Sequence, residues 1–219
     1  MMNSLLLPEV QNVLERLHTL ADNRDEAIVQ KVRGDEVKWN SATSEEKAAM
    51  LQDALLPVDG DAGRFLYAVA RSIRAKRIVE FGTSFGVSTI YFAAAAKDNG
   101  GGLVIGSELE PSKVAKAKQH LAEAGLSQFA EIRAGDAMQT LRDVDTVDLF
   151  FLDGWKLMYS DVLKLLMPNL RQGAVVLADD VTLFPADVAT YLDFVRDPAN
   201  GFVTATLPLG DGIEYSVKL

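Results

Sequence analysis

Three aspartates and one lysine form the pattern in this sequence that indicates chemistry most directly. Asp153 follows an apolar run at 147–152, and Asp179 and Asp180 follow a second apolar run at 173–178. If both runs are neighbouring parallel strands, their carboxyl ends share one edge, so we expect the three carboxylates to lie close together. Carboxylates gathered in this way either bind a hard divalent cation or form salt bridges, and Lys156 stands nearby in the sequence.

The ligand types available decide which cation fits. The sequence contains no cysteine, and its two histidines, His18 and His120, are distant in sequence from these acids and are expected to be ordinary helix residues. Oxygen ligands alone favour Mg²⁺, with Mn²⁺ or Ca²⁺ as the other candidates, over zinc. A divalent cation site is therefore one prediction for this edge, and a set of salt bridges is the alternative.

A glycine loop lies earlier in the chain. Gly82 and Gly86, with three residues between them, follow a short apolar run ending at Glu80 and precede a helix-like segment at 87–97. Glycines allow the positive φ angles and close backbone approach that a loop around a ligand needs, and a helix start offers free N–H groups to an anionic ligand. The spacing differs from the dinucleotide-binding and phosphate-binding glycine motifs.

Two further acids are predicted at the same edge. Glu108 ends the apolar run at 103–107, where its carboxylate could accept hydrogen bonds from both ribose hydroxyls of a nucleoside. Asp136 follows the predicted strand at 129–133. Both positions fall beyond the carboxyl ends of strands, level with Gly82. We therefore expect a nucleoside-binding site beside the acid cluster.

The elements that position these residues alternate between strand and helix. The predicted helices are 5–20, 22–37, 43–55, 64–73, 87–97, 112–124, one ending near 166, and 186–195. The predicted strands are 78–80, 103–107, 129–133, 147–152, 173–178, 202–207 and 212–219. This order predicts an α/β fold with a doubly wound, mostly parallel sheet, closed by a C-terminal antiparallel hairpin and preceded by N-terminal helices.

Composition limits the possible partners and location. The 219 residues suffice for one domain with an N-terminal appendage, and the net charge of −9 makes nucleic acid an unfavourable partner. The first ten residues lack the basic region of a signal peptide, and we see no apolar run long enough for a membrane span. We therefore expect a cytoplasmic protein with no membrane partner.

Several of these motifs together resemble a known family. The Asp-Gly-Trp-Lys segment at 153–156, followed by Tyr159, and the Ala-Asp-Asp-Val segment at 178–181 resemble elements of catechol O-methyltransferase and its bacterial relatives. The hairpin residues 211–214 also resemble that family, and the acid-Gly-x-x-x-Gly loop resembles the first motif of class I S-adenosylmethionine (SAM) methyltransferases. The resemblance covers about 58–219 and implies a Rossmann-like, seven-stranded methyltransferase domain there, with a helical appendage at 1–57.

The resemblance also implies roles for individual residues. Lys156 would be the general base, and Asp153, Asp179 and Asp180 would hold the divalent cation. The residues implied to bind SAM are Glu80, Gly82, Ser84, Gly86 and Ser88 around the methionine part, Glu108 at the ribose, and Asp136, Ala137 and Trp155 around the adenine. The implied reaction is transfer of the SAM methyl group to a hydroxyl of a catechol-like small molecule.

Two positions depart from the family's pattern, and the sequence leaves several alternative functions open. The family usually has Asn where Asp180 stands, and Gly154 replaces a bulkier residue of the mammalian enzyme. A related methyltransferase with another acceptor, such as a hydroxylated tRNA nucleoside, is one alternative, although the acidic composition disfavours it. A nucleotide-dependent or NAD-dependent protein and a non-catalytic SAM-binding module are others. A homodimer is a possible assembly.

Overall fold

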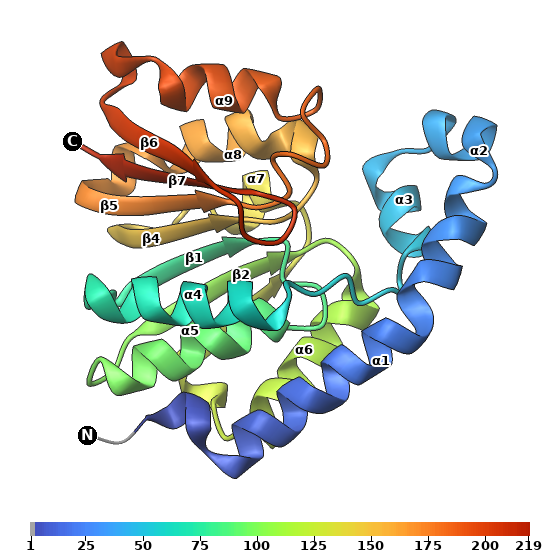
Figure 1. The fold of residues 1–219 in the computed structure, drawn as a ribbon, viewed down its shortest axis with the longest axis horizontal. Helices are drawn as coiled ribbons and strands as arrows, with labels where there is room; N and C mark the ends of the chain where they lie inside the picture. Colours follow the sequence, from blue (N-terminus) through green and yellow to red (C-terminus); the bar gives the residue numbers. More distant parts are fainter. Residues whose placement is uncertain (1–2) are drawn as a thin grey trace.

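The computed structural model describes residues 3–219 and has one seven-stranded sheet between two layers of helices (Figure 1). The strand order is β3-β2-β1-β4-β5-β7-β6, with β1 to β5 parallel and β7 antiparallel to both β5 and β6. The strands are β1 (Arg77–Phe81), β2 (Leu103–Glu108), β3 (Ala130–Ala134), β4 (Val147–Leu152), β5 (Leu170–Ala178), β6 (Phe202–Leu207) and β7 (Ile213–Lys218). The predicted doubly wound sheet with an antiparallel hairpin is confirmed.

Each face of the sheet has its own hydrophobic core. The helices are α1 (Pro8–Arg33), α2 (Glu36–Ser41), α3 (Ser44–Met50), α4 (Gly60–Ser72), α5 (Val87–Asp98), α6 (Pro111–Glu123), α7 (Ala137–Thr140), α8 (Tyr159–Leu166) and α9 (Ala189–Arg196). Residues of α1, α4, α5 and α6 fill one core, and residues of α7, α8 and α9 fill the other. Covering on both faces explains why β4 is an almost continuous apolar run.

Helix α5 is the most enclosed element. It packs against α4, β2, α1 and the short 3₁₀ helix η1 (Ser4–Leu6), and its residues from Val87 to Ala96 are all buried. Four consecutive alanines, 93–96, have no exposed surface. Their small side chains let α5 lie close to its neighbours, so the glycine loop before it is fixed to a rigid helix.

The N-terminal helices differ from the prediction. Segments 5–20 and 22–37 were expected to be separate helices, but α1 runs unbroken from Pro8 to Arg33. No glycine or proline interrupts this stretch, so the polar residues after 21 continue the helix on its exposed side. The capping box of Thr43 and Glu46 is confirmed at the start of α3, but that helix ends at Met50 and not at 55.

Other boundaries shift by a few residues. Asp59 caps α4, which therefore begins at Gly60, four residues before the predicted start at 64. Strand β5 begins at Leu170, three residues before its prediction, and α9 begins at Ala189, three residues after. Within 3–219 no helix is long and apolar enough to cross a membrane.

Candidate active site

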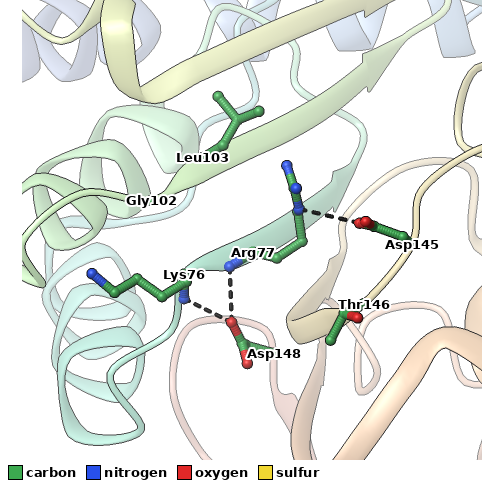
Figure 2. Close-up of a pocket in the computed structure, with 7 residues that line it drawn as sticks. All are labelled: Lys76, Arg77, Gly102, Leu103, Asp145, Thr146 and Asp148. Atoms are coloured by element: carbon green, nitrogen blue, oxygen red, sulfur yellow. Dashed lines mark hydrogen bonds and ion pairs between the residues drawn. The ribbon is translucent and has the colours of Figure 1, made fainter.

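The predicted site residues lie at the carboxyl ends of the parallel strands, on the right of the sheet in Figure 1. A hollow of about 310 Å³ lies at the opposite end, where β1 and β2 begin (Figure 2). Its charged groups are occupied: Asp148 accepts hydrogen bonds from the backbone N–H groups of Lys76 and Arg77, and the Lys76 ammonium donates to two backbone carbonyls. We therefore place the functional site at the carboxyl ends.

The glycine loop after β1 lies directly against the backbone that follows β4. Gly82 has a φ of +95°, and a Cβ atom added there would lie 2.6 Å from the carbonyl oxygen of Asp153 and from the nitrogen of Gly154. Only glycine permits this approach. Gly86, with a φ of +87°, precedes the first turn of α5, as the sequence predicts. The glycine loop at 82–86, which is the predicted cofactor loop, and the acid cluster of Asp153, Asp179 and Asp180 are thus neighbours.

Glu80 is fully buried under this loop. One oxygen of its carboxylate accepts hydrogen bonds from the hydroxyls of Thr83 and Thr89, and the other oxygen has no partner among the described residues. Burial raises the pKa of Glu80, although the hydroxyl donors Thr89 and Thr83 oppose the rise. A buried acceptor oxygen without a donor fits a site that receives a ligand with a hydrogen-bond donor.

Glu108 holds the other side of the loop. Its carboxylate accepts hydrogen bonds from the backbone N–H groups of Ser84 (2.7 Å) and Glu110 (2.8 Å). Ser84, with a φ of +46°, donates its hydroxyl to the carbonyl of Leu55 at 2.7 Å and accepts a bond of 3.2 Å from the Lys113 ammonium. Burial lowers the pKa of Lys113, and the charge of Glu108 opposes that effect.

The N-terminal segment closes over the same loop. Asp25 of α1 is buried and accepts hydrogen bonds from the N–H groups of Leu55 (3.0 Å) and Leu56 (2.6 Å). Leu55 in turn accepts the Ser84 hydroxyl. Segment 55–58 therefore lines a narrow space together with Gly82, Ser84, Ser88 and Asp153.

The predicted adenine residues lie on separate elements. The Asp136 carboxylate accepts a hydrogen bond from the N–H of Met138 (2.9 Å) and caps the short helix α7, in which Ala137 is buried. The N–H of Gly135 donates to the carbonyl of Glu108 at 2.8 Å, which places this turn beside the residue predicted to bind the ribose. Trp155, on the loop after β4, is half-buried.

The acid cluster surrounds a lysine. The Lys156 ammonium lies 2.8 Å from a carboxylate oxygen of Asp180 and 3.2 Å from one of Asp153. It also contacts the hydroxyl of Tyr159 at 2.8 Å, and that hydroxyl donates to the backbone carbonyl of Asp179 at 3.2 Å. Salt bridges, one of the two alternatives that the sequence left open, are therefore present.

Burial and mutual repulsion shift the ionisation of this cluster. Burial, reinforced by the neighbouring carboxylates, raises the pKa of Asp153 well above its usual range, and burial with the charge of Asp180 raises the pKa of Asp179 to about 7. Burial alone would lower the pKa of Lys156, but Tyr159 and the carboxylates of Asp153 and Asp180 hold it well above its usual value.

The donor set fits a hard divalent cation. One ammonium cannot balance three carboxylates, and burial together with the neighbouring carboxylates raises the pKa of Asp153 and of Asp179. All the acidic ligands are oxygens, which suit Mg²⁺, Mn²⁺ or Ca²⁺. Within residues 3–219, no three acidic or imidazole groups already form a cation cage. Lys156 instead contacts two of the three carboxylates.

Several contributing residues were not assigned a role from the sequence. Tyr159 lies three residues after Lys156, a spacing that places both on one face of a helical turn, so this signal was available. Thr83 and Thr89, whose hydroxyls donate to Glu80, lie close to it in sequence, so their role could also have been predicted. Asp25 and Lys113 are remote from the motifs, and so is Trp39, whose ring centroid lies 6.1 Å from that of Trp155. No sequence spacing links these three residues to the site.

Comparison with known proteins finds a methyltransferase domain and similar O-methyltransferases. A family model described as a methyltransferase domain matches residues 79–181. A catechol O-methyltransferase of Niastella koreensis is 32% identical over 131 residues, which cover 58% of this chain and 58% of that protein. The catechol O-methyltransferase of Mycobacterium tuberculosis is 31% identical over 150 residues, which cover 68% of this chain and 66% of that protein. The chain thus matches only part of the length of these relatives.

A solved structure extends the match to most of the fold. The O-methyltransferase TomG from Streptomyces achromogenes, in complex with SAM, has a TM-score of 0.69 and 25% identity, with coverage of 81% of this chain and 90% of that chain. The fold and the matched domain define a class I methyltransferase. Within that class, the chain is similar to SAM-dependent O-methyltransferases of the catechol O-methyltransferase type.

Proposed function

We propose that this protein transfers the methyl group of SAM to a hydroxyl of a catechol-like small molecule, in a reaction that depends on a divalent cation. The observation that carries the proposal is the contact between the two halves of the site. Gly82 of the cofactor loop approaches the backbone of Asp153, and Asp153 contacts Lys156. A methyl donor above the loop would therefore face an acceptor hydroxyl beside the lysine.

The chain's own residues supply positioning and proton transfer. Glu108 would accept hydrogen bonds from the ribose, and Glu80 with the glycine loop would bind the methionine part. The acceptor oxygen attacks the sulfonium methyl in line, so a C–O bond forms as the S–C bond breaks and S-adenosylhomocysteine leaves. Lys156, in its neutral amine form, would take the proton of the attacking hydroxyl.

The acid cluster would hold the cation. Asp153, Asp179 and Asp180 are the three candidate ligands. A divalent cation bound by them would acidify the acceptor hydroxyl and neutralise the carboxylates that raise the pKa of Lys156.

The test is a transfer assay with labelled SAM and a panel of catechols, with and without a chelator. Transfer should require Mg²⁺, whereas SAM binding measured by calorimetry should survive chelation, because Glu108 and the glycine loop are not among the proposed ligands of the cation. Full transfer activity after chelation would refute the cation requirement. A protein that binds SAM but methylates no member of the panel would refute the proposed acceptor class.

A further inference from the structure

Helix α1 contributes a buried carboxylate that the proposed reaction does not use. Asp25 lies in the C-terminal half of α1, remote in sequence from the glycine loop, and is 8% exposed. Each of its two oxygens accepts one backbone N–H, that of Leu55 at 3.0 Å and that of Leu56 at 2.6 Å. Because a buried charge is unfavourable unless it is hydrogen-bonded, these two bonds fix α1 and segment 55–58 to each other.

The segment that Asp25 holds has an unusual backbone. Leu56 has a φ of +48°, in the left-handed region that residues with side chains rarely adopt, and Ser84 of the glycine loop has a φ of +46°. Such conformations persist only where the surrounding contacts fix them. At Leu56 that contact is the bond from its N–H to Asp25. Loss of the carboxylate should therefore let this segment relax away from the glycine loop.

A chain of hydrogen bonds leads from Asp25 to the acid predicted to bind the ribose. Leu55 donates its N–H to Asp25, and its carbonyl accepts the hydroxyl of Ser84 at 2.7 Å. The N–H of Ser84 donates to the Glu108 carboxylate, also at 2.7 Å. Asp25 is thus linked to Glu108 through two successive backbone segments, although no contact joins the two acids directly.

A buried lysine reinforces the middle of this chain. The Lys113 ammonium is 7% exposed, donates to the Ser84 hydroxyl at 3.2 Å and lies 5.8 Å from the ring of Phe85. Burial lowers the pKa of Lys113, and the charges of Glu108 and Asp25 both oppose that effect. The ammonium therefore interacts with the acids at both ends of the chain, in surroundings where water screens such interactions weakly.

We infer that Asp25 is a positioning residue for SAM, which acts by fixing segment 55–58 against the glycine loop. The inference rests on the proposed placement of SAM at that loop and is independent of the acceptor and the cation. Segment 55–58 lines a narrow space together with Gly82, Ser84 and Ser88. A ligand bound there meets a wall that α1 holds in place beforehand, which reduces the entropy lost on binding. Helix α1 then belongs to the cofactor site.

The experiment measures the affinities of SAM and S-adenosylhomocysteine by calorimetry for the wild type, Asp25→Ala and Asp25→Asn. Asp25→Ala should weaken both by about tenfold, because two hydrogen bonds to a charged group are lost from the segment. Asp25→Asn keeps the side-chain size and one acceptor oxygen, so it should lose less. In transfer assays, KM for SAM should rise while kcat stays unchanged. Asp25→Asn also serves as the test if Asp25→Ala does not fold.

The matched control is Val13→Ala, a buried apolar position of the same helix outside the hydrogen-bonded chain. It should lower Tm, because a core side chain is truncated, and leave SAM affinity unchanged. Ser84→Ala tests the chain itself. Combined with Asp25→Ala, it should weaken SAM binding by less than the product of the two single effects, because both substitutions interrupt the same chain.

The possible failures can be told apart. Unchanged or tighter SAM binding by Asp25→Ala, or effects that multiply fully in the double variant, would overturn the inference. If Asp25→Ala keeps its SAM affinity while Glu108→Ala loses affinity, the positioning role fails and the placement of SAM stands. If neither substitution changes SAM affinity, the placement of SAM at the glycine loop fails, and the role of Asp25 fails with it.

Discussion

The carboxylates of the cofactor loop and those of the acid cluster are stabilised in different ways. Around the cofactor loop, Glu80 accepts hydrogen bonds from two hydroxyls and Glu108 from two backbone N–H groups, so neutral donors fixed by the fold hold each acid. In the acid cluster, Asp153, Asp179 and Asp180 lie around a single ammonium. The first half is organised before any ligand arrives, whereas the second lacks positive charge that a ligand would supply.

The largest expected effect comes from the lysine on which that cluster converges. Lys156→Ala should lower kcat by about 10²–10⁴, the range for a lost general base, and leave SAM affinity unchanged because the cofactor loop does not use the lysine. Steady-state kinetics and calorimetry on the same preparation measure both quantities. Lys164→Ala, an exposed lysine of α8, is the control. A near-normal rate across the pH profile would show that Lys156 is not the base.

A substitution in the cofactor-binding half of the site should weaken SAM binding and leave the chemical step unchanged. Glu108→Ala removes a charged acceptor and should weaken SAM binding by about 10–100-fold, because a hydrogen bond to a charged group contributes about 1.5–3 kcal/mol. Since Glu108 also holds the N–H of Ser84, part of this loss would come from a looser loop. Glu110→Ala controls for disturbance of the adjacent turn. Unchanged SAM affinity would exclude the ribose role.

A smaller change should separate the charge from the geometry of the acid cluster. Asp180→Asn keeps the side-chain shape but removes one of the charges that raise the pKa of Lys156. We expect weaker Mg²⁺ binding together with a pH–rate profile shifted to lower pH, because the lysine loses its proton more easily. Asp187→Asn, exposed in the same loop, is the control. Unchanged metal affinity would place Asp180 outside the cation's ligands.

The smallest effect concerns stability without metal. The pKa of Asp179 is raised from 3.8 to about 7, so the folded protein binds more protons than the unfolded chain between these values. Its stability should therefore fall as pH rises through this window, by a few degrees in Tm, and Mg²⁺ should reduce the fall. Thermal melts of chelated protein test this. Asp179→Asn should flatten the slope and the exposed control Asp161→Asn should not; a slope of opposite sign in chelated wild type would contradict the expectation.

Local patterns in the sequence were sufficient to predict the sheet. Each parallel strand is a short apolar run ending at an acid or a glycine turn, so the positions of Glu108 and Asp153 at one edge followed from the strand ends. The unbroken course of α1 did not follow, because the polar residues after 21 resemble a separate surface helix when the packing is unknown. Helix boundaries that depend on a single capping residue were also predicted inaccurately, as at the start of α4, which Asp59 caps.

The site was predictable only where its residues are close in sequence. Asp153, Trp155 and Lys156 form one motif, and the acids after β5 follow from strand pairing. Asp25 and Trp39 reach the site through the tertiary arrangement of α1 and α2, and no periodicity marks them. The ionisation of the cluster was also beyond sequence reasoning, because the salt bridges that raise the pKa of Lys156 depend on distances of about 3 Å.

The four buried alanines of α5 have a consequence for how the sequence can change. They lie at positions 93–96, away from any reacting group, but none of them has exposed surface into which a larger side chain could turn. An added methylene group there would have to displace the sheet, α1 or α4, at a cost of about 1–3 kcal/mol. The same helix begins at the glycine loop, so a displacement would move Gly86 as well. The placement of the cofactor loop thus depends on the volume of side chains that never meet the cofactor.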